Sequence, residues 1–430
     1  MFRSPLLSRV ALVPAGLAIL TGLGALWGPP GVRLALLLAC SLLTGLALGL
    51  ALLRSPRLAA WRGPAPTVRL RDVLPEAPLR TPIDRGRLRD HLANRTVLIT
   101  GAGGSIGSTL SRLLLDFSPF RVVLVDVSEY NLFRVEQALR REAFEGELEF
   151  RIADVRDELV MERLFDDFRP DLVLHAAAYK HVPLMERHPV EAFRNNTLAA
   201  VALLRLCERF ETEQFIFIST DKAVEPSSVL GATKRLVEWY VQSVDAPAER
   251  KIVRFGNVFG SEGSVVPLLR DQILSGKAVT LTHPDMVRFF MTATDACTLV
   301  LQTILLDEAQ TYILRMPSLR IQDLTKRMID FLHPWTPIGP RPRILYTGLR
   351  PGEKLEERLW DDSETPHPTM HPDVLGLDRP AHHSRAELDA WMGYLERLSE
   401  EHRAEELRHA LLAPSVHVPM DHPPARRTPS

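Results

Sequence analysis

Short apolar runs recur along the middle of the chain, and each is followed by a segment with apolar residues at helical spacing. The runs lie at residues 96–100, 121–125, 148–153, 171–175 and 215–218. After the first run, Leu110, Leu113, Leu114 and Phe117 recur with a helical period. Strands that alternate with helices at this interval form a parallel sheet covered on both faces. The pattern therefore predicts an α/β fold, a doubly wound parallel sheet, over residues 95–360.

Two longer apolar segments precede this domain. Residues 10–27 and 34–53 carry no charge, and as helices they would reach about 27 and 30 Å, roughly one hydrocarbon core each. A Gly-Pro-Pro-Gly turn at 28–31 separates them, so residues 1–54 are predicted to form a two-helix membrane hairpin, with a linker at 55–94. A cleaved signal peptide is the alternative, but the second apolar segment argues against cleavage.

The charges near these segments give the hairpin an orientation. Residues 1–95 contain thirteen Arg, no Lys and four acidic residues. Most of the Arg that flank the spans lie outside the turn, which places both ends of the hairpin and the residues after it in the cytoplasm. Because this basic region flanks apolar segments, it favours an anionic membrane surface and not nucleic acid.

The end of the chain differs in composition. Residues 361–430 are rich in His and Pro and are predicted to be a tail, with a charged amphipathic helix or helix pair at 388–412 and a disordered end from 414. Neither these histidines nor the three cysteines have the spacing of metal ligands, so no metal site is expected.

A glycine-rich turn follows the first strand directly. Residues 101–107 read Gly-Ala-Gly-Gly-Ser-Ile-Gly, the arrangement in which a backbone turn and a helix N-terminus hold a pyrophosphate. The second strand ends in Asp126, whose carboxylate can bind both adenosine ribose hydroxyls and would repel a 2′-phosphate. The sequence therefore predicts NAD as the cofactor. The predicted NAD-binding residues are Gly101, Gly104, Ser105, Ile106, Gly107, Asp126, Asp154, Val155, Ala176, Ala177 and Lys234.

The fifth strand ends in three reactive side chains in a row, Thr220, Asp221 and Lys222. Ligands of doubly wound sheets lie beyond the carboxyl ends of the strands. An adjacent acid and base suit a reaction that removes one proton and delivers another. Lysine is scarce here, seven residues against forty-five Arg, and only Lys can become a neutral base near neutral pH.

These motifs resemble the extended short-chain dehydrogenase/reductases. The segments at 175–183, 219–223, 231–235, 254–258, 282–284, 288–292 and 348–354 resemble one branch of them, the membrane-anchored UDP-N-acetylglucosamine 4,6-dehydratases of polysaccharide biosynthesis. The resemblance covers roughly residues 68–360 and implies a smaller C-terminal substrate-binding subdomain, with its elements starting at about residue 256. It also implies a bacterial inner-membrane location with a cytoplasmic catalytic domain.

The resemblance implies a specific reaction. Hydride passes from sugar C4 to NAD, water is eliminated across C5 and C6, and the hydride returns to C6. By position, Asp221 would protonate the leaving 6-hydroxyl, Lys222 would handle the C5 proton, Thr220 would hydrogen-bond the 4-oxygen and Lys234 would bind the nicotinamide ribose. The expected substrate-binding residues are Lys180, Asn196, Asn257, Arg288, Arg350 and Glu353, although structural roles are equally compatible with Lys180 and His181.

Leu230 departs from the wider family, because most short-chain dehydrogenases have a tyrosine base four residues before the lysine. Two alternatives stay open: a nucleotide-sugar 4-epimerase, which would rely on that tyrosine, and a non-catalytic NAD-binding scaffold of a membrane glycan-assembly complex. The partners expected are a UDP-N-acetylhexosamine, the cytoplasmic membrane and a second copy of the chain in a homo-oligomer, with no nucleic acid.

Overall fold

The computed structural model describes residues 29, 39, 41–46, 65–74, 82–244, 250–336, 340–378, 383–413 and 416. The chain forms two compact units, a smaller one of residues 1–67, 270–279 and 328–343 and a larger one of the remaining residues. The predicted membrane spans lie outside the described residues, apart from Ala39 and residues 41–46. Within the described ranges, no helix combines the length and the apolar character needed to cross a bilayer.

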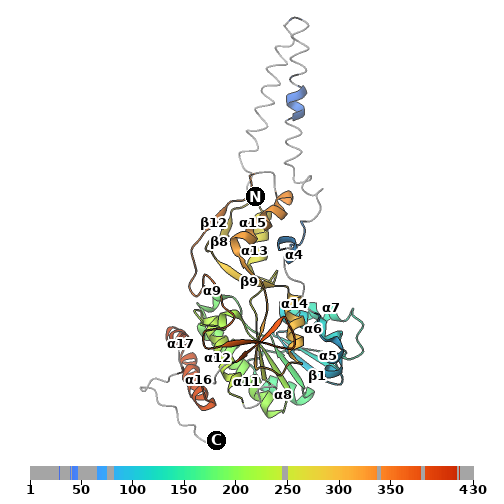
Figure 1. Ribbon diagram of the computed structural model, residues 1–430, viewed down its shortest axis with the longest axis vertical. Coiled ribbons are helices and arrows are strands. Elements are labelled where there is room, and N and C mark those ends of the chain that lie inside the picture. Colours follow the sequence, from blue (N-terminus) through green and yellow to red (C-terminus); the bar gives the residue numbers. More distant parts are fainter. Residues whose placement is uncertain are drawn as a thin grey trace. The chain divides into compact units, whose positions relative to one another are not determined.

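The larger unit is built on a nine-stranded sheet with the order β13-β14-β10-β6-β5-β4-β1-β2-β3. In Figure 1 the strands around β1 lie at the centre of this unit, with helices such as α6 and α12 around them. Seven strands from β3 to β10 are parallel, while β14 and β13 are added antiparallel at one edge. The strands are β1 (Thr96–Thr100), β2 (Arg121–Asp126), β3 (Glu147–Ile152), β4 (Leu172–His175), β5 (Gln214–Ile218), β6 (Arg250–Arg254), β10 (Thr311–Leu314), β13 (Thr365–Pro368) and β14 (Val374–Asp378). The prediction of a doubly wound parallel sheet is confirmed.

Buried side chains alternate between the two faces of the sheet. Leu98 belongs to one apolar core, and its neighbours Val97 and Ile99 belong to the other. Each core also contains apolar residues from helices, which shows that helices cover both faces of the sheet. On the Leu98 side these are α8 (Glu158–Phe168), α10 (Pro189–Phe193), α11 (Ala199–Arg209), α12 (Val229–Gln242), α16 (Arg385–Glu400) and α17 (Ala404–Leu411). On the Val97 side they are α5 (Arg85–Leu92), α6 (Ser105–Leu115), α7 (Glu129–Leu139) and α14 (Ala293–Thr303).

Two small sheets follow β6. One has the order β11-β9-β7, and the other pairs β12 with β8. The remaining elements are β7 (Asn257–Val258), β8 (Val279–Leu281), β9 (Val287–Met291), β11 (Ser318–Arg320), β12 (Ile344–Tyr346), α4 (Leu70–Val73), α9 (Val182–Met185), α13 (Val265–Leu274), α15 (Ile321–Leu332) and the short helices η2 (Arg194–Leu198), η3 (Asp221–Ala223) and η4 (His333–Trp335). The elements expected from about residue 256 are therefore not contiguous, because α14 and β10 return to the main sheet.

The predicted tail also differs from the structure at its start. Residues 365–378 form β13 and β14, which extend the central sheet, so the domain does not end at 360. The helical segment expected at 388–412 is a pair, α16 and α17, whose apolar residues Leu388, Leu395 and Leu407 join the main core. The end expected to be disordered lies outside the described residues, except for position 416.

Candidate active site

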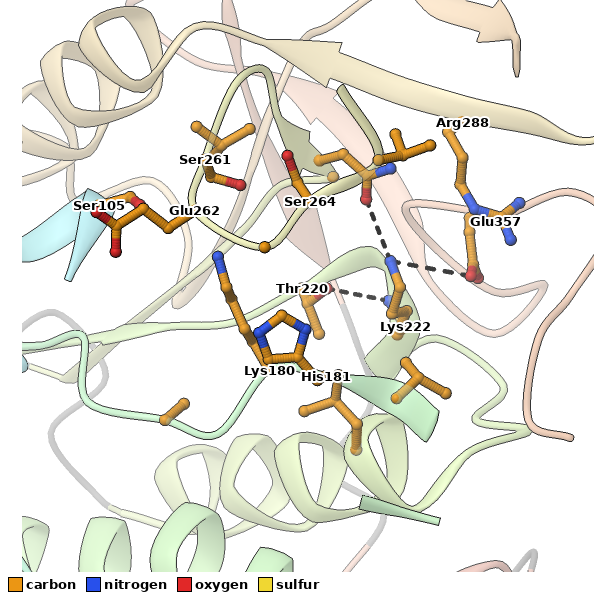
Figure 2. A pocket seen from close by; sticks show the side chains of 18 of the residues that line it. Ser105, Lys180, His181, Thr220, Lys222, Ser261, Glu262, Ser264, Arg288 and Glu357 are labelled. Atoms are coloured by element: carbon orange, nitrogen blue, oxygen red, sulfur yellow. Dashed lines mark hydrogen bonds and ion pairs between the residues drawn. The ribbon is translucent and has the colours of Figure 1, made fainter. Parts of the chain in front are cut away.

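A cavity of about 720 Å³ lies at the carboxyl ends of the central strands. The glycine turn after β1 lines it, together with the ends of β4 and β5 and residues from α12, β9 and the segment after β12. Topologically this is the point where the strand order changes direction, between β1 and β4. Figure 2 shows side chains from these separate segments around the same space.

The glycine turn needs glycine at two places. Gly101 has φ +68°, and a Cβ there would lie 2.7 Å from the Ala177 Cα. A Cβ on Gly107 would lie 2.1 Å from the Gly101 carbonyl oxygen. The turn consequently packs against the β4 loop and exposes the start of α6, where Ser105 and Ile106 line the cavity. A helix N-terminus in this position attracts a phosphate group.

The predicted adenosine end lies at the next two strands. The Asp126 carboxylate accepts hydrogen bonds from the Gly103 and Ser128 N–H groups, both at 2.8 Å, which ties the end of β2 to the glycine turn. Asp154 is paired with Arg156 at 2.6 Å, and these hydrogen bonds hold the pKa of its carboxyl below the usual value. Asp126, Asp154, Val155 and Ala177 are not among the cavity-lining residues, whereas Ala176 is.

The three reactive side chains after β5 lie on η3 and its cap. The Asp221 Oδ1 atom accepts hydrogen bonds from the Thr220 hydroxyl and the Lys222 ammonium, both at 2.9 Å. Asp221 is fully buried, and its Oδ2 atom has no hydrogen-bond partner among the described residues. Thr220 and Lys222 line the cavity. The structure thus brings together the hydroxyl, the carboxyl and the amine that the sequence placed in a row.

Lys234 lies one helical turn beyond Leu230 on α12, and both line the cavity. The Lys234 Nζ atom donates to the Ile218 carbonyl at 2.9 Å and lies 4.4 Å from the centre of the Phe217 ring. Burial lowers the pKa of Lys234 to about 7, and the negative charge of Glu238 only partly opposes this effect. The lysine can therefore change charge near neutral pH.

His175 supports this region from within the sheet. Its Nδ1 atom is 2.7 Å from the Thr100 hydroxyl, and its ring stacks near Phe215 and Phe217. Complete burial lowers the pKa of His175 to about 3, so the ring is neutral. The histidine joins the ends of β1 and β4 beneath the cavity.

Asn196 does not line the cavity. It is fully buried on η2, and its amide bonds both to the Tyr179 N–H at 2.8 Å and to the Tyr179 carbonyl at 3.0 Å. It holds the loop that carries Lys180 and His181, which do line the cavity. Burial lowers the pKa of both of these side chains.

The other expected substrate-binding residues, Asn257, Arg288, Arg350 and Glu353, all line the cavity. The Asn257 Oδ1 atom is 3.4 Å from Lys222 Nζ. The Arg288 guanidinium donates to the carbonyls of Val287, Lys354 and Leu355, at 2.7 to 3.1 Å, and so braces the segment after β12. Arg350 is exposed at the cavity, and its backbone N–H donates to the Glu353 carboxylate at 3.1 Å.

One lining residue was not expected from the sequence. Glu357 is only 4% exposed, and its Oε1 atom is 3.9 Å from Lys222 Nζ. In Figure 2 it lies next to Arg288 and opposite Lys222. No local sequence pattern marks Glu357, because the segment that carries it is neither a helix nor a strand. Across the described part of the chain, no group of His, Cys, Asp and Glu has the arrangement of a metal site.

Relatives share this region of the chain. The model of the polysaccharide biosynthesis protein family matches residues 97–378. The capsular polysaccharide biosynthesis protein CapD of Staphylococcus aureus is 39% identical over 332 residues, 75% of this chain and 54% of CapD. This chain therefore spans about half the length of CapD. An uncharacterized membrane protein of Methanocaldococcus jannaschii is 43% identical over 278 residues, 63% of this chain and 82% of that protein. A UDP-glucose 4-epimerase of Rickettsia conorii is 32% identical over 282 residues, 63% of this chain and 79% of the epimerase.

Solved structures share the fold. Pen from Bacillus thuringiensis is 29% identical with a TM-score of 0.61, covering 68% of this chain and 90% of Pen. The UDP-glucose 4-epimerase of Thermus thermophilus, solved in complex with NAD, is 24% identical with a TM-score of 0.51, covering 61% of this chain and 90% of the epimerase, a likeness of fold alone. The family match spans the glycine turn, the Asp221–Lys222 pair and the added strands β13 and β14. This chain therefore belongs to the polysaccharide biosynthesis protein family.

Proposed function

We propose that this protein is an NAD-dependent UDP-N-acetylglucosamine 4,6-dehydratase that makes a 4-keto-6-deoxy sugar nucleotide for a cell-surface polysaccharide. The observation that carries the proposal is the hydrogen-bonded cluster of Thr220, Asp221 and Lys222, with Leu230 in place of a tyrosine. Thr220 and Lys222 line the cavity, while Asp221 is buried and bonds to both of them. Elimination beside a ketone requires an acid and a base within reach of adjacent carbons, and this cluster supplies both. The kinship with CapD supports the polysaccharide role.

The residues present fit NAD. The close approach of Gly101 to Ala177 leaves no room for a side chain where a pyrophosphate passes, and the start of α6 is open to the cavity. The Asp126 carboxylate beside the glycine turn suits a ribose with free hydroxyls and disfavours a 2′-phosphate. Bound NAD would supply the hydride acceptor at sugar C4 and the hydride donor at C6.

The proposal assigns one task to each side chain of the cluster. The Thr220 hydroxyl hydrogen-bonds the sugar 4-oxygen and passes its proton to Asp221, to which it already donates at 2.9 Å. Asp221 then protonates the leaving 6-hydroxyl. Lys222 removes the C5 proton and later returns it. This route gives the 4-hydroxyl proton a destination without a tyrosine at position 230.

A nucleotide-sugar 4-epimerase is the second candidate, and the similarity to the Rickettsia conorii epimerase favours it. Epimerisation at C4 needs no acid and base at C5 and C6, so it would leave Asp221 and Lys222 without a task. A non-catalytic scaffold is a third reading, supported by Leu230 alone.

We also propose that residues 1–54 tether the enzyme to the cytoplasmic face of the membrane, on the apolar pattern and Arg distribution of the sequence. The relative from Methanocaldococcus jannaschii, which carries the name of a membrane protein, supports this.

Mass analysis after incubation of the purified full-length protein with UDP-N-acetylglucosamine tests the function. A dehydratase yields a product lighter by one water. A product of unchanged mass with the inverted C4 configuration would establish the epimerase. If neither UDP-N-acetylglucosamine nor any other UDP-sugar tested is converted, the scaffold is favoured.

A further inference from the structure

Oxygen acceptors surround the Lys222 amine. Its Nζ atom lies 2.9 Å from Asp221 Oδ1, 3.4 Å from Asn257 Oδ1 and 3.9 Å from Glu357 Oε1. Three oxygen acceptors, two of them carboxylate oxygens, match the three N–H groups of a lysine ammonium. An ammonium cannot remove the C5 proton. If Lys222 is the base of the proposed reaction, another group must first take a proton from it.

Glu357 has the surroundings of a group that can take this proton. Its carboxyl is almost completely buried beside Lys222, and its Oε2 atom has no hydrogen-bond partner among the described residues. Burial, together with the negative charge of Asp221, raises the pKa of Glu357, while the positive charges of Lys222, Arg288 and Lys354 act in the opposite direction. The carboxyl therefore accepts a proton more readily than an exposed glutamate does.

The buried carboxylates with a purely structural role in this domain differ from Glu357. The Glu364 carboxylate receives two hydrogen bonds from the Arg254 guanidinium, both at 2.8 Å. Glu238 also receives two bonds from Arg254, at 2.8 and 2.6 Å, and these lie away from the cavity lining. Among the described residues, the ion pairs of Glu357 are longer, with the Lys222 and Lys354 Nζ atoms each 3.9 Å from a carboxyl oxygen, and Glu357 lines the cavity. The Glu357 carboxyl thus lies near cationic side chains, but none of them is at the short hydrogen-bond distance that Arg254 has to Glu364 and Glu238.

From this geometry we propose that Glu357 takes the ammonium proton of Lys222 and thereby makes Lys222 the base that acts on C5. The inference rests on the proposed dehydratase function. A small rotation of the flexible lysine side chain closes the 3.9 Å separation. Glu357 is in this sense a positioning residue, because it acts on the substrate only through Lys222.

The protons balance over the cycle. The ammonium of Lys222 gives one proton to the Glu357 carboxylate and becomes a neutral amine. The amine takes the proton from C5 while the C6–O bond breaks and Asp221 supplies a proton to the departing oxygen. When hydride arrives at C6, the C5 proton returns from Lys222, and Glu357 gives its proton back to the amine. Asp221, which received the 4-hydroxyl proton, ends with the charge that it had at the start.

Glu357→Gln is the main test, since it keeps the shape and removes the proton acceptor. We expect turnover of UDP-N-acetylglucosamine at neutral pH to fall by about 10- to 100-fold, with KM close to the wild-type value. This loss is below the roughly 10²–10⁴-fold typical of a group that exchanges a proton with the substrate itself, because Glu357 acts through Lys222. Because Lys222 must then lose its proton to solvent, the residual rate should rise with pH into the alkaline range. Hydride uptake from C4 should continue, so enzyme-bound NADH accumulates while deuterium incorporation at C5 slows.

Two companion variants make the result interpretable. Glu356→Gln changes the exposed neighbouring glutamate and should leave turnover and its pH profile unchanged. Glu357→Asp restores a carboxyl at a greater separation and should recover part of the rate and the wild-type pH profile. If Glu357→Gln does not fold, Glu357→Asp serves as the test, because the proposal also predicts a slower C5 exchange at unchanged KM for this variant.

The two proposals fail in different ways. A wild-type protein that removes no water from the sugar nucleotide overturns the dehydratase function. The role of Glu357 alone is overturned by a different result. In that case the wild-type protein removes water, and Glu357→Gln or Glu357→Asp exchanges the C5 proton at the wild-type rate and with the wild-type pH profile.

Discussion

Asp221 and Lys222 are adjacent in sequence but differ in exposure, and this difference separates their roles. The Asp221 side chain is completely buried, whereas the Lys222 side chain is 20% exposed at the cavity. A carboxyl can act as a general acid toward a leaving group, and one oxygen of Asp221 has no hydrogen-bond partner among the described residues. A partly exposed amine can move toward a substrate carbon.

Substitution of each residue should stop a different step. Asp221→Asn removes the acid for the 6-hydroxyl and also the acceptor of the 4-hydroxyl proton. It should therefore block water loss and leave only slow C4 oxidation, visible as weak enzyme-bound NADH absorbance. Lys222→Ala should abolish deuterium exchange at C5. General acid–base groups are worth about 10²–10⁴-fold in rate, so we expect losses of this size in turnover. Small effects from both substitutions would remove the pair from the chemistry.

Leu230 lines the cavity one helical turn before Lys234, and its side chain is 5% exposed. Leu230→Met should be nearly silent, because the two side chains have similar volume and methionine adapts to irregular gaps. Thr220→Val removes the hydroxyl that bonds to Asp221 and should cost most of the activity. Steady-state rates for both variants check this. Rescue of an inactive wild-type protein by Leu230→Tyr would instead support the scaffold reading.

The buried charge of Lys234 should make stability depend on pH. Its pKa is about 7 in the folded chain and about 10.4 when unfolded. Below the folded value both states bind the proton, and the full cost of burying the charge is present. Between the two values only the unfolded state binds it, so the free energy of unfolding rises with pH in that window.

Lys234→Met should remove this rise. Urea unfolding at several pH values, with equal NAD loading, measures the difference between wild type and variant, and Lys326→Met at an exposed position is the control. Parallel pH profiles for wild type and Lys234→Met would show that the lysine is not buried as a titrating group.

At the scale of elements, β14 pairs with β10, and buried charges tie the segment before β13 to the rest of the domain. Glu364, just before β13, pairs with Arg254 at the end of β6, and Asp361 pairs with Arg235 on α12 at 2.6 Å. Arg254 also pairs with Glu238, which accepts a hydrogen bond from Ser219 at 2.6 Å. The added strands thus support the backbone that precedes Thr220.

Removing one partner of this network should be costly. Glu364→Ala leaves the buried Arg254 without one of its two carboxylates, and we expect a loss of about 3–5 kcal/mol in the free energy of unfolding. Asp362→Ala, at a side chain that is 95% exposed, should cost less than about 1 kcal/mol. Chemical denaturation of both variants measures the contrast, and equal midpoints would contradict it.

At the scale of the whole molecule, the proposed tether can be tested by its orientation. An alkaline phosphatase fused after Ser430 should be inactive and a cytoplasmic reporter at the same place active, because the Arg distribution predicts that both ends of the proposed hairpin are cytoplasmic. A phosphatase fused after Gly31, between the two predicted spans, should be active in the periplasm. The reverse pattern would contradict the orientation.

The sequence by itself determined the features that depend on local pattern. The alternation of apolar runs and helical periods predicted β1 to β5 to within a residue at each end, and the glycine spacing predicted the turn after β1. Thr220, Asp221 and Lys222 meet because they are consecutive at a strand end. Such features follow from the period of strands and helices and from the backbone freedom of glycine.

Only the tertiary structure decided which distant residues share the site. Glu357 reaches Lys222 from a segment far along the chain, Asn196 turns inward to hold the Tyr179 backbone, and the segment expected as a tail supplies two strands of the sheet. None of these has a local period, because each depends on long-range packing and on the pairing of buried polar groups. A buried carboxylate is stabilised by a nearby cation, and the folded domain determines which cation lies near it, not the neighbouring residues in the sequence.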